Sequence, residues 1–121
     1  MILVVEDEAV VRMALVDSLE LLNYRVLEVS NGEAALETLE QRQGEITLVL
    51  SDVVMPQMSG TALLHALREK GLTVPLVMLS GRSSRQEMEK LRAKGMTGWL
   101  PKPLDLEQLA QVVAQALDMY E

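Results

Sequence analysis

Five short apolar runs alternate along this chain with five stretches of helical periodicity, and no repeat, low-complexity tract or linker interrupts the alternation. Each apolar run is continuous, which is typical of parallel strands that helices cover on both faces. We expect strands at Ile2–Val5, Arg25–Val29, Ile46–Ser51, Val74–Leu79 and Gly98–Leu100. The pattern predicts an α/β fold, a doubly wound (βα)5 domain with right-handed crossovers and a five-stranded parallel sheet.

Signals for helix ends agree with this alternation. Three pairs resemble capping boxes at helix starts, namely Ser30 with Glu33, Ser84 with Glu87, and Asp105 with Gln108. Glycines stand where three of the helices should end, at Gly44, Gly71 and Gly95.

The doubly wound class includes a flavodoxin-like strand order, 2-1-3-4-5, whose switch point lies between the first and third strands. That order places Asp7 and Asp52 on neighbouring strands and sends the second strand to the edge. The second strand is also the one whose end, Ser30-Asn31, carries neither an acid nor a lysine. We therefore expect this order.

Length and composition fit one domain over residues 1–121, since 49% of the 121 residues are hydrophobic. The net charge of −7 argues against direct nucleic-acid binding, which depends on basic side chains. Without cysteine the chain can form neither a disulfide nor a thiolate metal site. Acids interrupt the first apolar run, which therefore resembles neither a signal peptide nor a membrane span, and we expect a cytoplasmic domain without membrane contact.

Four of the apolar runs end in polar side chains suited to phosphoryl transfer: Glu6-Asp7, Ser51-Asp52, Ser80 and Lys102. In an open parallel sheet such groups meet beyond the carboxyl ends of the strands. Two carboxylates about 4 Å apart repel by roughly 4 kcal/mol at an effective dielectric near 20, so such a cluster indicates a ligand. We expect Asp7 and Asp52 to bind Mg²⁺, with Glu6 holding one of its waters.

Asp52 is the candidate nucleophile, because a carboxylate can attack a phosphoryl group to give an acyl phosphate. Such transfer depends mainly on positioning and charge neutralisation. Lys102 would supply a compact positive charge for one phosphate oxygen, and Ser80 a hydrogen bond for another.

Four motifs in this order resemble the receiver domain of two-component response regulators, over essentially the whole chain: Glu6-Asp7, the segment Asp52-Val-Val-Met-Pro-Gln-Met-Ser-Gly60, Ser80-Gly81 and Pro101-Lys102-Pro103. The resemblance implies that a histidine kinase or histidine phosphotransfer domain phosphorylates Asp52. It also implies Mg²⁺ bound by Asp7, Asp52 and the backbone carbonyl of Val54. Ser80 would be the switch hydroxyl and Trp99 the switch aromatic residue, and the Lys102–Pro103 bond should be cis.

Some positions depart from the usual receiver pattern. Ser80 stands where threonine is commoner, and Trp99 where tyrosine or phenylalanine is commoner. The segment from Gly95 to Pro101 resembles receivers of hybrid sensor kinases more than those of DNA-binding regulators. Because Met1 lies directly before the first strand, we expect an excised piece of a longer protein. Homodimer formation is left open.

Two other functions compete with a phosphoacceptor signalling domain. A Mg²⁺-dependent phosphohydrolase with an aspartyl-phosphate intermediate would generally need a second carboxylate two residues after the nucleophile, where this chain has Val54. An interaction module independent of phosphorylation is disfavoured, because every site residue is present.

Val54 also predicts the rate of dephosphorylation, which we expect to be no faster than the family's middle range. Arg82 is expected to limit this rate as a second gate. The single histidine, His65, is expected to be solvated and away from the site.

Overall fold

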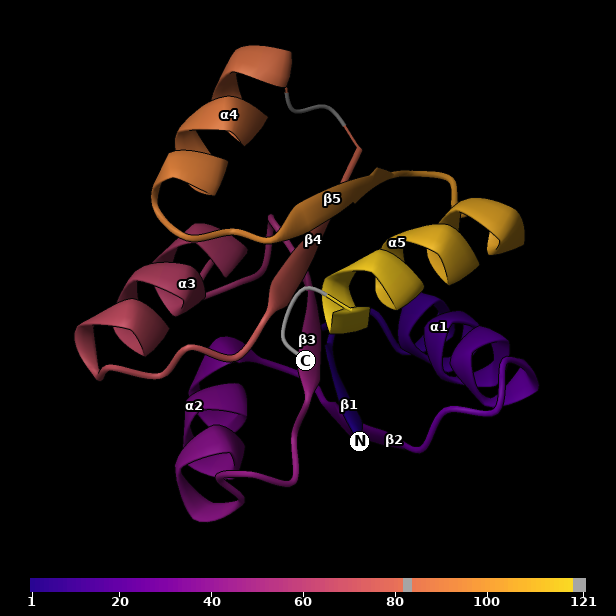
Figure 1. The fold of residues 1–121 in the computed structure, drawn as a ribbon, viewed down its shortest axis with the longest axis horizontal. Coiled ribbons are helices and arrows are strands. Elements are labelled where there is room, and N and C mark those ends of the chain that lie inside the picture. Colours follow the sequence, from indigo (N-terminus) through magenta and orange to yellow (C-terminus); the bar gives the residue numbers. More distant parts are fainter. Residues whose placement is uncertain (82–83, 119–121) are drawn as a thin grey trace.

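The structure is a computed structural model, and it describes residues 1–81 and 84–118 of the chain. Strands and helices alternate throughout (Figure 1). In chain order the elements are β1 (Ile2–Val5), α1 (Ala9–Leu21), β2 (Val26–Val29), α2 (Gly32–Gln41), β3 (Leu48–Asp52), α3 (Gly60–Glu69), β4 (Leu76–Ser80), α4 (Arg85–Ala93), β5 (Gly98–Pro101) and α5 (Leu106–Asp118).

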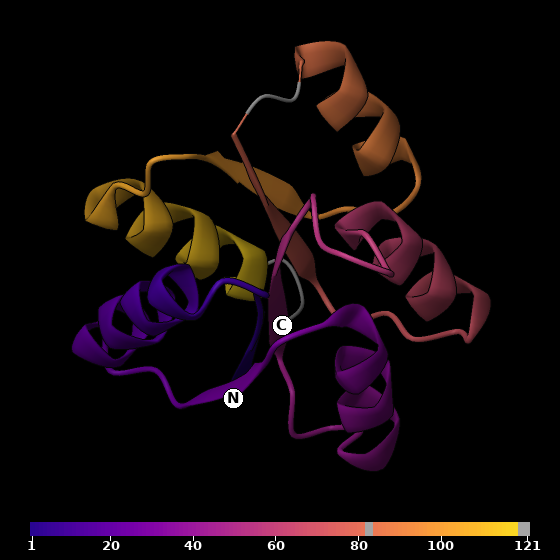
Figure 2. The ribbon, with the colours of Figure 1, turned by 180° about the vertical axis from the view of Figure 1, so that it is seen from behind.

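The five strands form one parallel sheet in the order β2-β1-β3-β4-β5, which confirms the expected topology. Helices α1 and α5 cover one face of this sheet, and α2, α3 and α4 cover the other (Figures 1 and 2). The first connection runs from β1 out to the edge at β2. The chain then returns across β1 to β3, so β1 and β3 become neighbours although residues 6–47 separate them.

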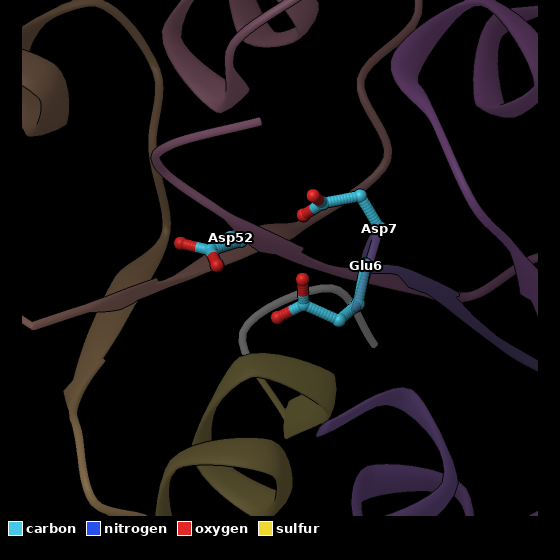
Figure 3. Close-up of side chains that lie close together, drawn as sticks. All are labelled: Glu6, Asp7 and Asp52. Carbon is cyan, nitrogen blue, oxygen red and sulfur yellow. The ribbon is translucent and has the colours of Figure 1, made fainter. Parts of the chain in front are cut away.

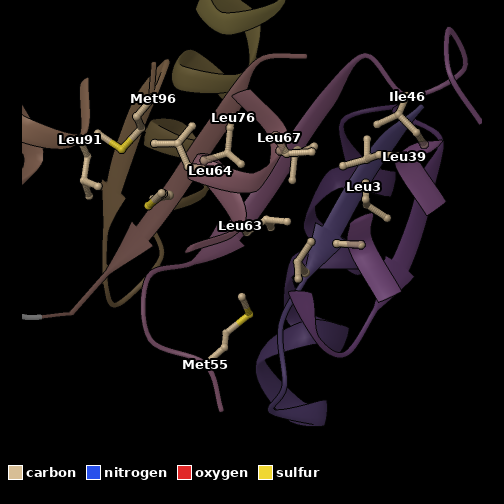
Figure 4. Close-up of a cluster of buried hydrophobic side chains, with 14 of the residues drawn as sticks. Leu3, Leu39, Ile46, Met55, Leu63, Leu64, Leu67, Leu76, Leu91 and Met96 are labelled. Atoms are coloured by element: carbon tan, nitrogen blue, oxygen red, sulfur yellow. The ribbon is translucent and has the colours of Figure 1, made fainter. Parts of the chain in front are cut away.

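Each face of the sheet has its own hydrophobic core. Leu3, Val49 and Met78 point into the core beneath α2, α3 and α4, part of which is shown in Figure 4. Their neighbours along the strands, such as Val4 and Val77, point into the core beneath α1 and α5. Successive strand residues face opposite sides of a sheet, so burial on both sides explains why the apolar runs are continuous.

The helix starts confirm two of the three predicted caps and correct the third. The Ser84 hydroxyl accepts the Glu87 N–H at 3.1 Å, and Asp105 Oδ1 accepts the Glu107 N–H at 2.8 Å. Helix α2, however, is capped by Asn31, whose Oδ1 accepts the Ala34 N–H at 2.8 Å. The prediction of Ser30 was wrong by one residue, because the capping side chain must directly precede the first helical residue, here Gly32.

Gly71 and Gly95 directly follow the C-cap residues of α3 and α4, as predicted, whereas Gly44 comes three residues after α2 ends at Gln41; all three glycines have positive φ. Such a φ costs a glycine no steric strain, which suits it to the residue just beyond a helix. Among the described residues, no helix is both long enough and apolar enough to cross a membrane.

Candidate phosphoryl-acceptor site

Three carboxylates meet where β1 and β3 end (Figure 3). The strands pair in parallel with Val5 opposite Ser51, so Glu6, which directly follows β1, lies at the level of Asp52, the last residue of β3. Glu6, Asp7 and Asp52 each offer an oxygen, and these oxygens all lie within 4.8 Å of one another. The predicted meeting of the first acidic pair with Asp52 is therefore observed.

Asp52 is nearly buried, with 6% of its surface exposed, and both carboxylate oxygens have a protein donor. Lys102 Nζ donates to Asp52 Oδ2 at 2.6 Å, and the Val54 N–H donates to Asp52 Oδ1 at 3.2 Å. The same ammonium lies 3.7 Å from Glu6 Oε1. A buried charge needs such partners, and this lysine serves two carboxylates at once.

Lys102 is held at the site by the backbone of β5 and β4. Its N–H donates to the Ser80 carbonyl at 2.9 Å, and its bond to Pro103 is cis, as predicted. Burial by itself lowers the pKa of Lys102, but the hydrogen bond and charge of Asp52, with help from Glu6 and Glu8, outweigh it and raise the pKa. The side chain is therefore a fixed positive charge at neutral pH.

Glu6 is fully buried, and its two carboxylate oxygens differ. Oε2 accepts the Glu8 N–H at 3.2 Å, whereas Oε1 has no hydrogen-bond partner among the described residues. Burial raises the pKa of Glu6 from 4.5 to about 7; the Glu8 N–H opposes this shift, and the carboxylates of Asp7 and Asp52 add to it. The site thus contains more negative charge than its own lysine neutralises.

These residues fit a small divalent cation. Carboxylate oxygens are the ligands that Mg²⁺ prefers. Glu6 Oε1 is buried and has no hydrogen-bond donor within the described part of the chain, so it is suited to a water or cation. Asp7 is the most exposed of the three acids, so the cluster is open to solvent at Asp7.

The other predicted site residues lie on β4, on β5 and in the segment after β3. Ser80 is nearly buried at the end of β4, the strand next to β3, whereas the Val54 side chain is exposed. Trp99 on β5 is half-buried and packs against the core beneath α4. The Arg92 guanidinium lies 5.0 Å from the centre of its ring, in range of a cation–π interaction.

Two further predicted residues lie away from the site or outside the described part of the chain. His65 is exposed on α3, where its Nε2 lies 3.5 Å from Glu69 Oε2, as expected of a solvated residue. Arg82, predicted as a second gate, lies outside the described residues.

Two contributors to the site were not predicted from the sequence. Arg12 on α1 donates from Nη1 to the Glu6 carbonyl at 2.8 Å, and nothing in the sequence pattern distinguishes it from a solvated arginine. Gly60 begins α3 so close to β3 that a Cβ there would lie 2.4 Å from the Asp52 carbonyl oxygen. Its place at the end of the motif that starts at Asp52 was the available signal.

A buried aspartate paired with lysine, among acids at the switch point of a doubly wound sheet, is suited to accept a phosphoryl group. A family model described as the response regulator receiver domain matches residues 2–114. The chain belongs to the receiver domain family of two-component systems, and a phosphohydrolase is not favoured.

Individual relatives agree. The chain is 41% identical over 117 residues to sensor kinase CckA of Brucella abortus, covering 97% of this chain and 12% of that protein. It is 36% identical over 120 residues to sensor histidine kinase RcsC of Escherichia coli K12, covering 99% of this chain and again 12% of the relative. The expected likeness to receivers of sensor kinases is confirmed.

Solved structures show the same fold. A receiver domain protein from Clostridium thermocellum superposes with a TM-score of 0.92 at 23% identity, covering 98% of this chain and 94% of that one. At that identity the likeness concerns the fold alone, and it confirms the flavodoxin-like arrangement.

Proposed function

We propose that Asp52 accepts a phosphoryl group from a phosphohistidine of a histidine kinase or histidine phosphotransfer domain. The observation that carries this proposal is the contact of Asp52 Oδ2 with Lys102 Nζ at 2.6 Å, beside two more carboxylates at the sheet edge. We further propose that residues 1–121 act as a single receiver domain. The chain spans only 12% of the length of each of these two sensor kinases. That it belongs to a larger phosphorelay protein is therefore also a proposal.

The transfer is a displacement at phosphorus. A carboxylate oxygen of Asp52 attacks the phosphorus atom, the P–N bond to the donor imidazole breaks, and the imidazole leaves with the electron pair and takes up a proton. The product is an acyl phosphate on Asp52. Lys102 would neutralise one phosphoryl oxygen, and Ser80 on the adjacent strand would donate its hydroxyl hydrogen to another.

Asp7, Asp52 and the Val54 carbonyl are the groups we assign to Mg²⁺, with Glu6 orienting one of its waters. The ion would offset the negative charge of the phosphoryl oxygens as they approach the acidic cluster. The support is the set of carboxylate oxygens within 4.8 Å of one another and the Glu6 oxygen for which residues 1–81 and 84–118 provide no hydrogen-bond donor.

The domain would act on itself, catalysing its own phosphorylation and slow dephosphorylation, and would not turn over a separate substrate. Two residues beyond Asp52, where a hydrolase of this type generally has its proton donor, Val54 presents an exposed aliphatic side chain. Ser80 and Trp99 would convert phosphorylation into a change of surface that a partner reads. We place the domain in the cytoplasm, where ATP supplies histidine kinases.

A protein donor also needs a place to bind near Asp52. Exposed apolar side chains follow the site residues closely in sequence on three elements: Val10 and Met13 on α1, Val54 after β3, and Leu106 at the start of α5. Apolar groups around a charged pocket are typical of a surface that a partner covers. We call these four exposed apolar residues the rim of the site, and we propose that the phosphohistidine-bearing protein binds across it.

Intact-mass spectrometry after incubation with Mg²⁺ and phosphoramidate tests the central proposal. The parent should gain the mass of one phosphoryl group, and the adduct should be lost on treatment with hydroxylamine, which cleaves acyl phosphates. Asp52→Asn should gain nothing. Asp17→Asn removes an exposed acid from α1 and should behave as the parent. An adduct on Asp52→Asn, or none on the parent, would contradict the proposal.

A further inference from the structure

Arg12 extends from α1 back to the end of β1. Its Nη1 donates to the Glu6 carbonyl oxygen at 2.8 Å, and its Nε lies 3.2 Å from Glu28 Oε1 on β2. The side chain is 19% exposed, whereas that of Glu28 is 47% exposed. One guanidinium therefore links the first helix, the end of the first strand and the edge strand.

The carbonyl that Arg12 contacts belongs to the peptide group between Glu6 and Asp7. A peptide group is planar, so holding its oxygen sets the direction in which the chain leaves β1. That direction determines where both acidic side chains start. From the other side of the turn, the Glu8 N–H binds Glu6 Oε2 at 3.2 Å. The turn that carries two site carboxylates is thus held by its backbone and by a side chain.

This turn needs such support because its charges oppose it. Glu6, Asp7 and Asp52 repel one another, and the free energy of the site would fall if Asp7 turned away into water. An arginine can bind two acceptors at once through its planar fork, whereas a lysine offers a single ammonium. The geometry at Arg12 uses this property, since Glu6 and Glu28 accept from different nitrogens.

We infer that Arg12 is a positioning residue for the acidic site. It acts through the peptide between Glu6 and Asp7, keeping both carboxylates directed at Asp52, and it does not touch the phosphoryl group. The inference rests on the proposed function, because it concerns the same Mg²⁺ and phosphoryl site.

The sign of the change in Mg²⁺ affinity tests this role. If Arg12 acted only as a charge, Arg12→Met would remove a cation near the acids and strengthen Mg²⁺ binding. A positioning role predicts the reverse, weakening by about tenfold, as is usual when a group that orients metal ligands is lost. Isothermal titration calorimetry measures the affinity, and thermal melting in EDTA shows whether the fold persists.

Arg42→Met is the matched control. Arg42 is also an arginine paired with a glutamate, Glu45 at 3.8 Å, but it follows α2, and the Glu45 carbonyl accepts from the Met1 ammonium just before β1 begins, at the other end of the strand from the site. The substitution changes the net charge equally and should leave Mg²⁺ affinity at or slightly above that of the parent. Equal weakening in both variants would show a general effect and overturn the inference.

Two milder variants keep the test decisive if Arg12→Met does not fold. Arg12→Lys retains the charge but replaces the two separate nitrogens that reach Glu28 and the Glu6 carbonyl by a single ammonium at the end of a flexible chain, so its Mg²⁺ affinity should lie between those of the parent and Arg12→Met. Glu28→Gln leaves the contact with Glu6 in place and should bind Mg²⁺ nearly as the parent does. In NMR spectra without Mg²⁺, the Asp7 and Glu8 amide signals should shift in Arg12→Lys more than in Glu28→Gln.

Failure of this inference differs from failure of the proposed function. If the parent neither binds Mg²⁺ nor accepts a phosphoryl group, both are wrong. If the parent does both and the folded Arg12 variants bind Mg²⁺ as tightly, the receiver function stands and the role of Arg12 is refuted.

Discussion

Glu6 shows that a side chain can be unfavourable for stability and yet be suited to function. This residue is fully buried, and one of its carboxylate oxygens lacks a hydrogen-bond donor among the described residues. An apolar or amide side chain would be better for folding alone. The proposed Mg²⁺ would explain the carboxylate, because it would add positive charge to a site where the single charge of Lys102 contacts both Glu6 and Asp52.

The raised pKa of Glu6 predicts a pH dependence of stability without Mg²⁺. The folded state holds the proton more tightly than the unfolded state, so the contribution of Glu6 is most favourable below pH 4.5 and is lost as the pH rises to about 7. In EDTA, the parent should lose unfolding free energy across this range relative to Glu6→Gln, by a few kcal/mol. Urea denaturation at several pH values measures the difference. Parallel pH profiles would contradict the prediction.

Val54 predicts a second effect at the residue scale, on the lifetime of the acyl phosphate. Its side chain is exposed two residues beyond Asp52 and has no polar group to orient an attacking water. We expect Val54→Asn to lose its phosphoryl group faster than the parent, because an amide can hold that water. Decay of the adduct by intact mass measures the rate, with Val54→Ala as the aliphatic control. An unchanged rate in Val54→Asn would refute this role.

Among the elements, the contact of α3 with β3 bears most directly on the site. The Gly60 N–H donates to the Val53 carbonyl at 2.9 Å, and its Cα approaches Asp52 so closely that no side chain fits. The start of α3 therefore braces the loop that follows the acceptor aspartate.

Replacing Gly60 by alanine should affect both stability and phosphorylation. A Cβ would meet the Asp52 carbonyl oxygen at 2.4 Å, so α3 or the end of β3 must shift. We expect a loss of about 2 kcal/mol in unfolding free energy, and slower phosphorylation by phosphoramidate. Gly98→Ala is the control, since its Cβ would lie 3.7 Å from the Val112 Cγ1, an ordinary contact. Equal stability of the two variants would contradict the prediction.

The whole molecule is acidic, and it presents several exposed apolar side chains. Its net charge is −7, yet exposed apolar side chains occur beside the acidic site. Val10 lies at the site end of α1, and Leu21 at the other end of the same helix. The two residues allow a comparison of equally apolar, exposed positions.

Substitution of Val10 should affect phosphoryl transfer from a protein donor differently from transfer by a small-molecule donor. Val10 and Leu21 are 81% and 75% exposed, so Val10→Ser and Leu21→Ser should both preserve the fold. Val10→Ser should slow transfer from a phosphorylated histidine phosphotransfer domain but not from phosphoramidate, because only a protein donor covers the rim. Leu21→Ser should match the parent with both donors. Slowing with phosphoramidate as well would place the effect at Asp52 itself.

The sequence alone determined the alternation of strands and helices and the residues at the strand ends, because apolar periodicity and local polar positions are properties of short segments. It also supported the order 2-1-3-4-5, since that order brings the acids together. The sequence also predicted that Lys102 and Asp52 belong to one site, but only the tertiary structure decided the contacts between individual atoms. Lys102 meets Asp52 from 50 residues away, burial raises the pKa of Glu6, and Arg12 binds the Glu6 carbonyl. These depend on how side chains from different elements pack, and no single segment encodes them.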